Sequence, residues 1–83
     1  MFKLLISVRA QKRIRLLKIS HQEAILSALQ EIKEDPFIGK PLTRELMGRF
    51  SYRVGIYRII YQVNQQDKTI RILNAGHRAT VYQ

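Results

Sequence analysis

The chain has 83 residues, and 15 Lys and Arg against six Asp and Glu give it a formal net charge of +9. This length allows one domain with a modest core, and the apolar fraction of 46% is enough for folding. The absence of cysteine excludes disulfides, thiolate zinc sites and a cysteine nucleophile. The charge favours polyanionic partners: nucleic acid, an acidic protein or an anionic membrane.

The start of the chain predicts a strand followed by a helix. Residues 2–8 are rich in apolar and β-branched residues, as in a buried central strand, and Ser7 can cap the helix after it. Ala10, Ile14 and Leu17 then recur at helical spacing between basic residues. The apolar start is too short for a secretory signal or a membrane span, so we expect a cytoplasmic protein that does not enter a membrane.

A second helix is predicted over residues 21–34. Ser20 and Glu23 have the spacing of a capping box at its start. Asp35–Pro36 ends it, because the residue before a proline avoids the helical region. One apolar stripe runs along this helix: Ile25, Ala28, Leu29 and Ile32.

After a connector over residues 37–48, in which Leu42 and Leu46 are expected at the edge of the core, the apolar period changes to two. Strands are predicted at residues 50–54, 57–63, 69–75 and, as a short last one, 79–82, with turns at 55–56 and 64–68. Gly76 is expected to end the third of these strands. The fold class is therefore α+β in the order β-α-α-β-β-β(-β), a twisted, mostly antiparallel sheet with an αα-hairpin packed on one face, in a single domain over residues 1–83.

No pattern typical of a metal or cofactor site occurs. His21 and His77 are far apart in sequence and lack an accompanying carboxylate cluster, and glycine-rich nucleotide-binding patterns are absent. The few acidic residues disfavour a paired-carboxylate hydrolase, and a serine triad lacks a carboxylate near His77. We therefore expect no cofactor and no metal.

What remains is a group of basic residues in the β-rich half. Arginine forks pair with phosphate oxygens, and tyrosine can stack on bases or exchange a proton. The group comprises Arg49, Arg53, Arg58, Arg71, His77 and Arg78, interleaved with Tyr52, Tyr57, Tyr61 and Tyr82.

Two of these tyrosines and two of these arginines also have a purely structural interpretation. Tyr57 and Tyr61 share a strand face with Ile59, which favours the core, and Arg71 alternates with isoleucines as a solvated strand residue does. Arg58 lies between apolar neighbours, so it needs either a structural carboxylate or a ligand phosphate.

Three segments resemble the RelE/ParE superfamily of bacterial toxins: SVRAQKRIRLL, DPFIGKPLTRELMGRFSYRVGIYRIIYQV and NAGHRATVY. The resemblance covers essentially the whole chain and implies two helices on an antiparallel sheet. It also implies a ribosome-dependent mRNA interferase of the RelE branch, which acts on translated mRNA in the ribosomal A site beside ribosomal RNA. The implied protein partner is a cognate antitoxin that wraps and blocks the toxin, and operator DNA is bound only through that complex.

The resemblance assigns catalytic residues by position. Arg58 matches an arginine that stabilises the scissile phosphate, Arg78 a second catalytic arginine, and Tyr82 a tyrosine that helps activate the attacking hydroxyl. Arg53 matches a basic residue on the preceding strand, and His77 stands where other members carry lysine. The expected reaction is attack by the RNA 2′-OH, with Tyr82 or His77 as base and Arg78 or His77 supporting the leaving group, giving a 2′,3′-cyclic phosphate.

Ser51 departs from the pattern, because RelE-like toxins often carry a basic residue there. Arg49 can compensate from further back, and Arg49, Ser51 and Arg71 complete the expected RNA-binding set. Two other functions remain open: a non-enzymatic inhibitor of DNA gyrase, as in the ParE branch, and an inactive module that only pairs with an antitoxin.

Overall fold

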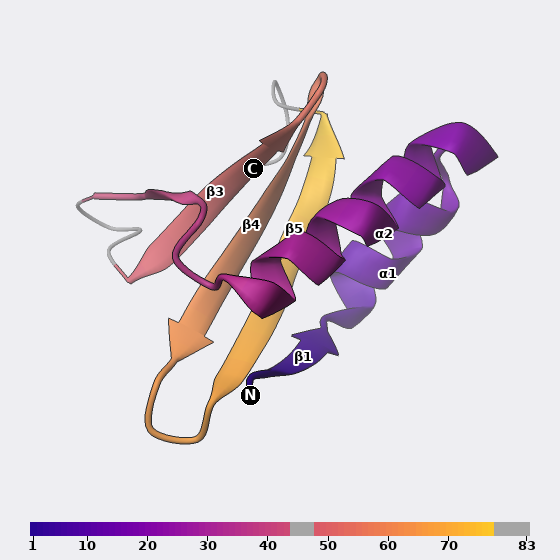
Figure 1. Cartoon of the computed structure of the whole chain (residues 1–83). Coiled ribbons are helices and arrows are strands. Elements are labelled where there is room, and N and C mark those ends of the chain that lie inside the picture. Colours follow the sequence, from indigo (N-terminus) through magenta and orange to yellow (C-terminus); the bar gives the residue numbers. More distant parts are fainter. Residues whose placement is uncertain (44–47, 78–83) are drawn as a thin grey trace.

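The computed structural model describes residues 1–43 and 48–77 as two helices and one five-stranded sheet (Figure 1). The elements are β1 (Lys3–Ile6), α1 (Val8–Arg15), α2 (Ile19–Glu34), β2 (Lys40–Pro41), β3 (Arg49–Val54), β4 (Tyr57–Asn64) and β5 (Thr69–His77). Leu46, Arg78, Tyr82 and the strand expected at residues 79–82 lie outside the described residues. Neither of the two described helices is long and apolar enough to span a bilayer.

The strands follow the order β1-β5-β4-β3-β2, and every neighbouring pair is antiparallel except β1 with β5. This confirms the predicted α+β class. The expectation of a central first strand is wrong, because β1 forms the edge of the sheet and pairs only with β5. β1 is apolar because Leu4 and Ile6 pack against the hydrophobic core, whereas Leu5 is 37% exposed.

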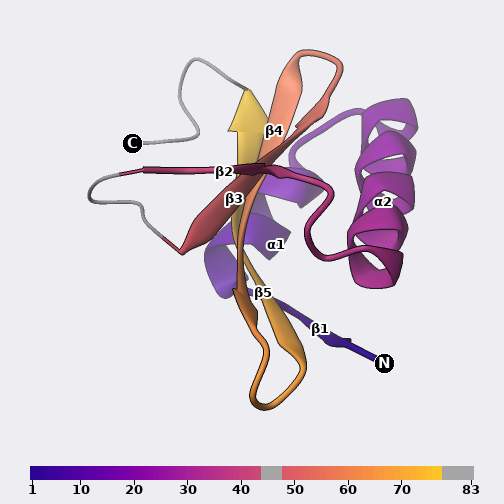
Figure 2. The same ribbon diagram turned by 60° about the vertical axis from the view of Figure 1, so that its left-hand side comes forward.

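The two helices occupy different places beside the sheet. α2 lies over one face, and turning the molecule shows it on one side of the edge-on strands (Figure 2). α1 follows directly from β1 and packs mainly against β5. Because β1 is short, α1 lies next to the part of β5 that has no strand partner on that side.

The core lies between α2 and the sheet. The predicted stripe of α2 is buried there, from Ile25 to Ile32, together with Ala10 and Ile14 of α1. The strands contribute the other side of the core, including Ile59, Tyr61, Ile70, Ile72 and Ala75. The helical and strand periods read from the sequence therefore identify the residues that meet in the core.

The starts of the two helices differ in how they are capped. Ser7 caps α1 as predicted, because its Oγ accepts a hydrogen bond from the Ala10 amide at 3.1 Å. The prediction of a capping box at Ser20 is wrong, because α2 begins at Ile19, with Lys18 at the N-cap position and no side-chain cap. The Gln22 side chain donates to the Leu17 carbonyl at 2.8 Å, which joins the start of α2 to the end of α1.

Tyr61 fastens the connector to the sheet. Its Oη donates to the Pro36 carbonyl at 2.8 Å and accepts from the Gly39 amide at 3.0 Å, and its side chain is fully buried. A Cβ at Gly39 would lie 2.6 Å from this oxygen, so only glycine fits there. Phe50 stacks on the Tyr61 ring at 5.4 Å. The connector also adds the short strand β2, which the sequence did not predict.

β5 continues past its predicted end. Gly76 pairs with Arg58 and His77 pairs with Tyr57, so the break expected at Gly76 is wrong. The irregularity lies earlier, where the register shifts opposite Ile60 and Tyr61. There Ser7 donates through its Oγ to the Leu73 carbonyl at 2.9 Å. The long strand β5 carries Gly76 directly across from Arg58.

Candidate nucleic-acid interface

The sheet face turned away from α2, here called the distal face, collects most of the predicted site. Directly paired residues of neighbouring strands project to the same side, so the register assigns each side chain to a face. The distal face includes Lys40 from β2, Arg49, Ser51 and Arg53 from β3, Arg58, Ile60 and Gln62 from β4, and Arg71, Asn74 and Gly76 from β5. The structure thus brings together Arg49, Ser51, Arg53, Arg58 and Arg71.

Arg58 stands in the middle of this face and is half-buried. Its Nη1 donates to the Ser51 Oγ at 3.2 Å, which draws the side chain towards β3. Within the described residues the guanidinium therefore meets a neutral hydroxyl and not the structural carboxylate that the sequence left possible. Most of its donors remain available for an anion.

Arg53 lies directly opposite Arg58 in the β3–β4 pair. Its side chain is exposed and reaches the Gly55 carbonyl at 3.4 Å through Nε. Like charges placed directly across a strand pair destabilise it. An anion held between the two guanidinium groups would remove that repulsion.

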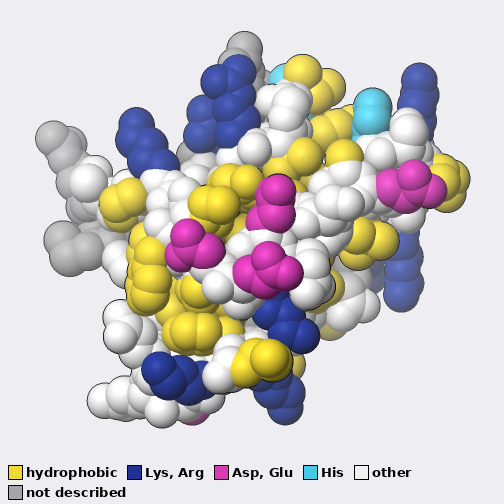
Figure 3. All heavy atoms as spheres, viewed as in Figure 1, with side chains coloured by type: hydrophobic (Ala, Val, Ile, Leu, Met, Phe, Trp, Pro, Cys, Tyr) yellow, Lys and Arg dark blue, Asp and Glu magenta, His cyan; other side chains and the backbone are white. Residues whose placement is uncertain are grey.

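The acidic side chains that the structure describes lie away from the distal face. Glu23, Glu31 and Glu34 lie on α2, Asp35 follows at its end, and Asp67 is in the turn between β4 and β5. Figure 3 shows the acidic side chains gathered on the side of α2. In the part of the chain that the structure describes, the strands carry arginine but no Asp or Glu. The charged side chains described on the distal face are therefore all basic.

One end of the distal face is lined by amides. Arg49, Gln62 and Arg71 form a row across β3, β4 and β5. A cavity of about 310 Å³ lies beside it, lined by Gln62, Val63, Asn64, Gln65 and Arg71. Arg71 is exposed, in agreement with the solvated position predicted for it.

His77 is not brought to this face. Its direct partner in the sheet is Tyr57, whose ring lies 6.5 Å from the His77 ring in an edge-on arrangement. Tyr57 faces α2, where its Oη lies 2.8 Å from Nδ1 of His21. The structure therefore separates His77 from Arg58 by the thickness of the sheet, because adjacent strand residues point to opposite sides. Tyr57 is half-buried and Tyr61 fully buried on the α2 side, as the alternation predicted.

Two tyrosines with shifted pKa values lie on the α2 side. Tyr52 donates to Glu31 Oε2 at 2.7 Å, and this hydrogen bond to the carboxylate raises the pKa of Tyr52. Burial raises the pKa of Tyr61. Both shifts favour the neutral phenol, so neither side chain is prepared to act as a base.

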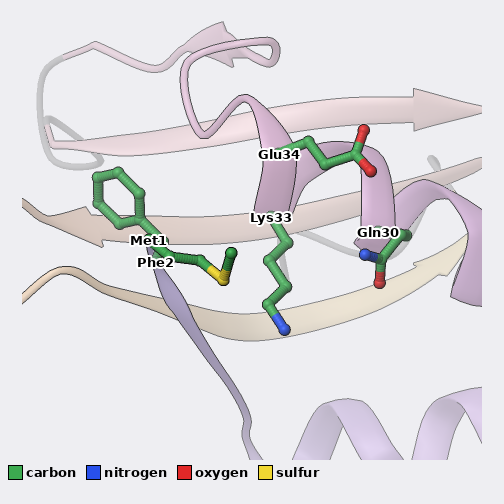
Figure 4. A pocket seen from close by; sticks show the side chains of 5 residues that line it. All are labelled: Met1, Phe2, Gln30, Lys33 and Glu34. Atoms are coloured by element: carbon green, nitrogen blue, oxygen red, sulfur yellow. The ribbon is translucent and has the colours of Figure 1, made fainter.

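Two further cavities have no arginine in their linings. One of about 420 Å³ is formed by Met1 and Phe2 at the start of the chain and by Gln30, Lys33 and Glu34 at the end of α2 (Figure 4). Another, of about 330 Å³, lies between α2 and the β3–β4 turn and is lined by His21, Ala24, Val54, Gly55, Ile56 and Tyr57. Among residues 1–43 and 48–77, no three metal-ligating side chains gather.

The structure adds one arginine that the sequence did not assign to the site. Arg13 of α1 is half-buried, and its Nη1 lies 3.3 Å from the position that a Cβ of Gly76 would occupy. The pairing of Gly76 with Arg58 places this guanidinium beside the centre of the distal face. The available signal was a glycine inside a strand, which often marks a close approach by another group.

The fold and the positive distal face define a small basic α+β protein of the type found among bacterial toxins. Residues 4–82 match the family described as ParE toxin of type II toxin–antitoxin system, parDE. The chain belongs to this toxin family and, with it, to the RelE/ParE superfamily.

Individual relatives agree with this assignment. Toxin RelG of Mycobacterium tuberculosis is 42% identical over 57 residues, which span 68% of this chain and 66% of that protein. The crystal structure of the toxin–antitoxin complex RelBE2 from the same organism contains a chain with 32% identity and a TM-score of 0.85, covering 93% of this chain and 98% of that one. The YoeB/ParE toxin from Agrobacterium tumefaciens shares the fold at 19% identity, with a TM-score of 0.82 over 93% of this chain and 99% of that one.

Proposed function

We propose that this toxin is a metal-independent endoribonuclease that cleaves translated mRNA in the ribosomal A site. The observation that carries the proposal is Arg58: a half-buried arginine, opposite Arg53, that meets a hydroxyl and not a carboxylate. Two arginines at directly paired strand positions, on a face without Asp or Glu among the described residues, suit a phosphodiester, whose charge rises as the reaction proceeds.

The chemistry needs no nucleophile from the protein, because RNA supplies its 2′-OH. A base removes the 2′ proton, the O2′–P bond forms, and the P–O5′ bond breaks as the 5′ oxygen takes up a proton. Arg53 and Arg58 would stabilise the phosphorane. The products would be a 2′,3′-cyclic phosphate and a 5′-OH.

The residues proposed for the two proton transfers, Arg78 and Tyr82, lie outside the described residues. Tyr82 is proposed as the base and Arg78 as the group that supports the leaving oxygen, both from the family resemblance. His77 faces Tyr57 on the other side of the sheet, so we assign it no proton transfer at the phosphate. Among the residues that the structure describes, the distal face holds arginine, lysine, serine and amide groups but no strong base, which is the reason to propose that the ribosome assists.

The proposed partners follow from the relatives. RelBE2 is a toxin–antitoxin complex. We propose that this chain likewise binds a cognate antitoxin, and that operator DNA is bound only through that complex. The toxin alone would act on mRNA in the cytoplasm.

The experiment is expression from a tightly repressed promoter, followed by mapping of mRNA 5′ ends. Wild-type protein should arrest growth and produce codon-phased cuts within translated regions. Arg58→Ala should abolish both, whereas Arg15→Ala, which removes an exposed arginine of α1, should change neither. Cuts that persist at the wild-type level in Arg58→Ala would disprove the proposed site.

A second candidate is inhibition of DNA gyrase without cleavage of mRNA, because the matching family model describes ParE toxin. The same expression experiment separates the two functions. A DNA-damage response without new mRNA 5′ ends would establish the gyrase-inhibiting function and exclude the ribonuclease.

A further inference from the structure

Arg13 occupies an unusual position for a basic residue of a surface helix. α1 buries Ala10 and Ile14 and exposes Lys12 and Arg15, while Arg13 is half-buried at the margin of the packed side. Its side chain extends over β5, where Cδ lies 3.8 Å and Nη1 3.3 Å from the Cβ position of Gly76. A Cβ at Gly76 would crowd this guanidinium, because 3.3 Å is closer than an ordinary van der Waals contact.

Gly76 and Arg58 are direct partners across β5 and β4. Side-chain positions of such partners are separated by about 5 Å. Arg58 leans away from β5 to reach Ser51, so the space over Gly76 is taken by Arg13. Arg13 and Arg58 therefore approach the centre of the distal face from opposite sides.

Packing alone does not explain a charged group here. Within the described residues, no carboxylate or carbonyl forms a hydrogen bond or ion pair with the Arg13 guanidinium. Placing another cation beside Arg58, on a face without Asp or Glu among the described residues, raises the electrostatic energy of the free protein. Binding of a polyanion reverses that cost.

We infer that Arg13 is a further phosphate-binding residue of the distal face, which holds a backbone phosphate of single-stranded RNA next to the one at Arg58. The inference rests on the proposed function, since it extends the same substrate track from β4 over β5 to α1. Arg13 would contribute as a positioning cation for the RNA backbone, independent of base sequence.

The test is binding of a short single-stranded RNA with 2′-O-methyl groups at every position, which blocks the nucleophile and prevents cleavage. Affinity is measured over a range of salt concentrations for the wild-type protein, Arg13→Gln and Arg15→Gln. Arg13→Gln should lower the affinity about tenfold at low salt and reduce the slope of log K against log salt by about 0.7, the value for one lost phosphate contact on a single strand. Arg15→Gln should change the affinity less than about twofold, as expected for a distant surface charge.

Gly76→Ala provides an independent variant that keeps all charges. Its Cβ would lie 3.3 Å from Nη1 of Arg13, so the flexible end of this side chain must shift slightly; the affinity should fall by less than in Arg13→Gln while the net charge stays the same. Thermal unfolding of each variant identifies any loss of folded protein. Equal affinities for Arg13→Gln and Arg15→Gln in folded proteins would overturn the inference, and so would an absence of binding by the wild type.

The RNA-binding test of Arg13 and the mRNA-cleavage test of the proposed function can fail independently of each other. Selective loss of binding in Arg13→Gln without any mRNA cuts in cells would support the phosphate contact and reject the ribonuclease. Cuts by the wild-type protein together with unchanged binding in Arg13→Gln would reject only the role of Arg13.

Discussion

The two faces of the sheet are made from alternating residues of the same strands, yet one packs into the core with α2 and the other carries the arginines. On the α2 side, Ile59, Tyr61 and Ile72 are fully buried, and the phenol of Tyr61 is satisfied by backbone groups. On the distal face, Arg53 and Arg58 oppose each other with a serine as the neighbouring group. The α2 side thus carries the core and its polar anchor, while the distal face carries the arginines that we propose to bind an anion. Stability and activity should therefore respond to different substitutions one residue apart.

The largest effect is expected from the neighbouring isoleucines of β4. Ile59 lies in the core between the sheet and α2, whereas Ile60 is buried on the distal side. Ile59→Ala should lower the free energy of unfolding by about 2–5 kcal/mol, through lost apolar burial and the cavity left behind. Ile60→Ala should cost less. Urea unfolding of both variants measures this, and an equal loss would remove the distinction between the faces.

Arg58 should show the reverse pattern, with activity lost and stability kept. Arg58→Ala should reduce the rate of RNA cleavage on translating ribosomes about 10²–10³-fold, the usual effect of removing one group that stabilises the transition-state charge. Arg58→Lys should restore only part of the rate, because lysine lacks the fork that binds two phosphate oxygens. Cleavage rates and urea midpoints are measured on the same samples. An Arg58→Ala protein that unfolds as readily as Ile59→Ala would show that the arginine is structural.

Substitution of Tyr61 tests whether its buried hydroxyl, on the α2 side, contributes only to stability. Tyr61→Phe leaves the Gly39 amide without its acceptor and the Pro36 carbonyl without its donor, at a cost of about 1–3 kcal/mol. Burial raises the pKa of Tyr61 in the folded state, while the unfolded phenol ionises near its ordinary pKa of about 10. The contribution is therefore complete below about pH 10 and is lost as the pH rises further.

Urea unfolding at neutral and alkaline pH checks both parts of this prediction. Stability of the wild-type protein should fall more steeply above about pH 10 than that of Tyr61→Phe, since only the wild type carries this phenol. Lysine titration is common to both proteins and cancels in the difference. Parallel pH profiles would mean that the Tyr61 phenol ionises equally easily in both states.

The two faces were not equally predictable. Apolar period predicted the α2 side well: Ile25, Ile32 and Tyr61 are all buried where the spacing placed them. It could not predict that β1 lies at the edge of the sheet, because a short apolar strand has the same sequence pattern at the edge and in the centre. The extension of β5 through Gly76 was also missed, since a glycine ends one strand and gives space for a neighbouring side chain in another.

For the distal face, strand alternation predicts the side correctly: Ile59 points into the core, and Arg53, Arg58 and Ser51 point to the opposite side of the sheet. It also turns His77 away from them, once β5 is known to run that far. Arg13 could not be found from strand alternation at all, because its place depends on how α1 packs against β5. Local spacing thus predicts which face a residue is on, whereas contacts between distant segments decide which charges meet.

Substitutions of Ser51 should have the smallest effect, and they test whether its hydroxyl orients Arg58 on the distal face. It is 3% exposed, and its Oγ accepts the hydrogen bond of Arg58. Ser51→Ala should leave Arg58 charged but less well oriented, and one such hydrogen bond is worth about 1 kcal/mol, or roughly a fivefold loss in cleavage rate. Ser51→Lys, which restores the basic residue that the resemblance leads one to expect, should lower activity further, because it buries a second charge against the Arg58 guanidinium. Cleavage rates of both variants on translating ribosomes decide the matter: a gain of activity in Ser51→Lys would mean that the hydroxyl is a defect of this toxin and not the group that orients Arg58.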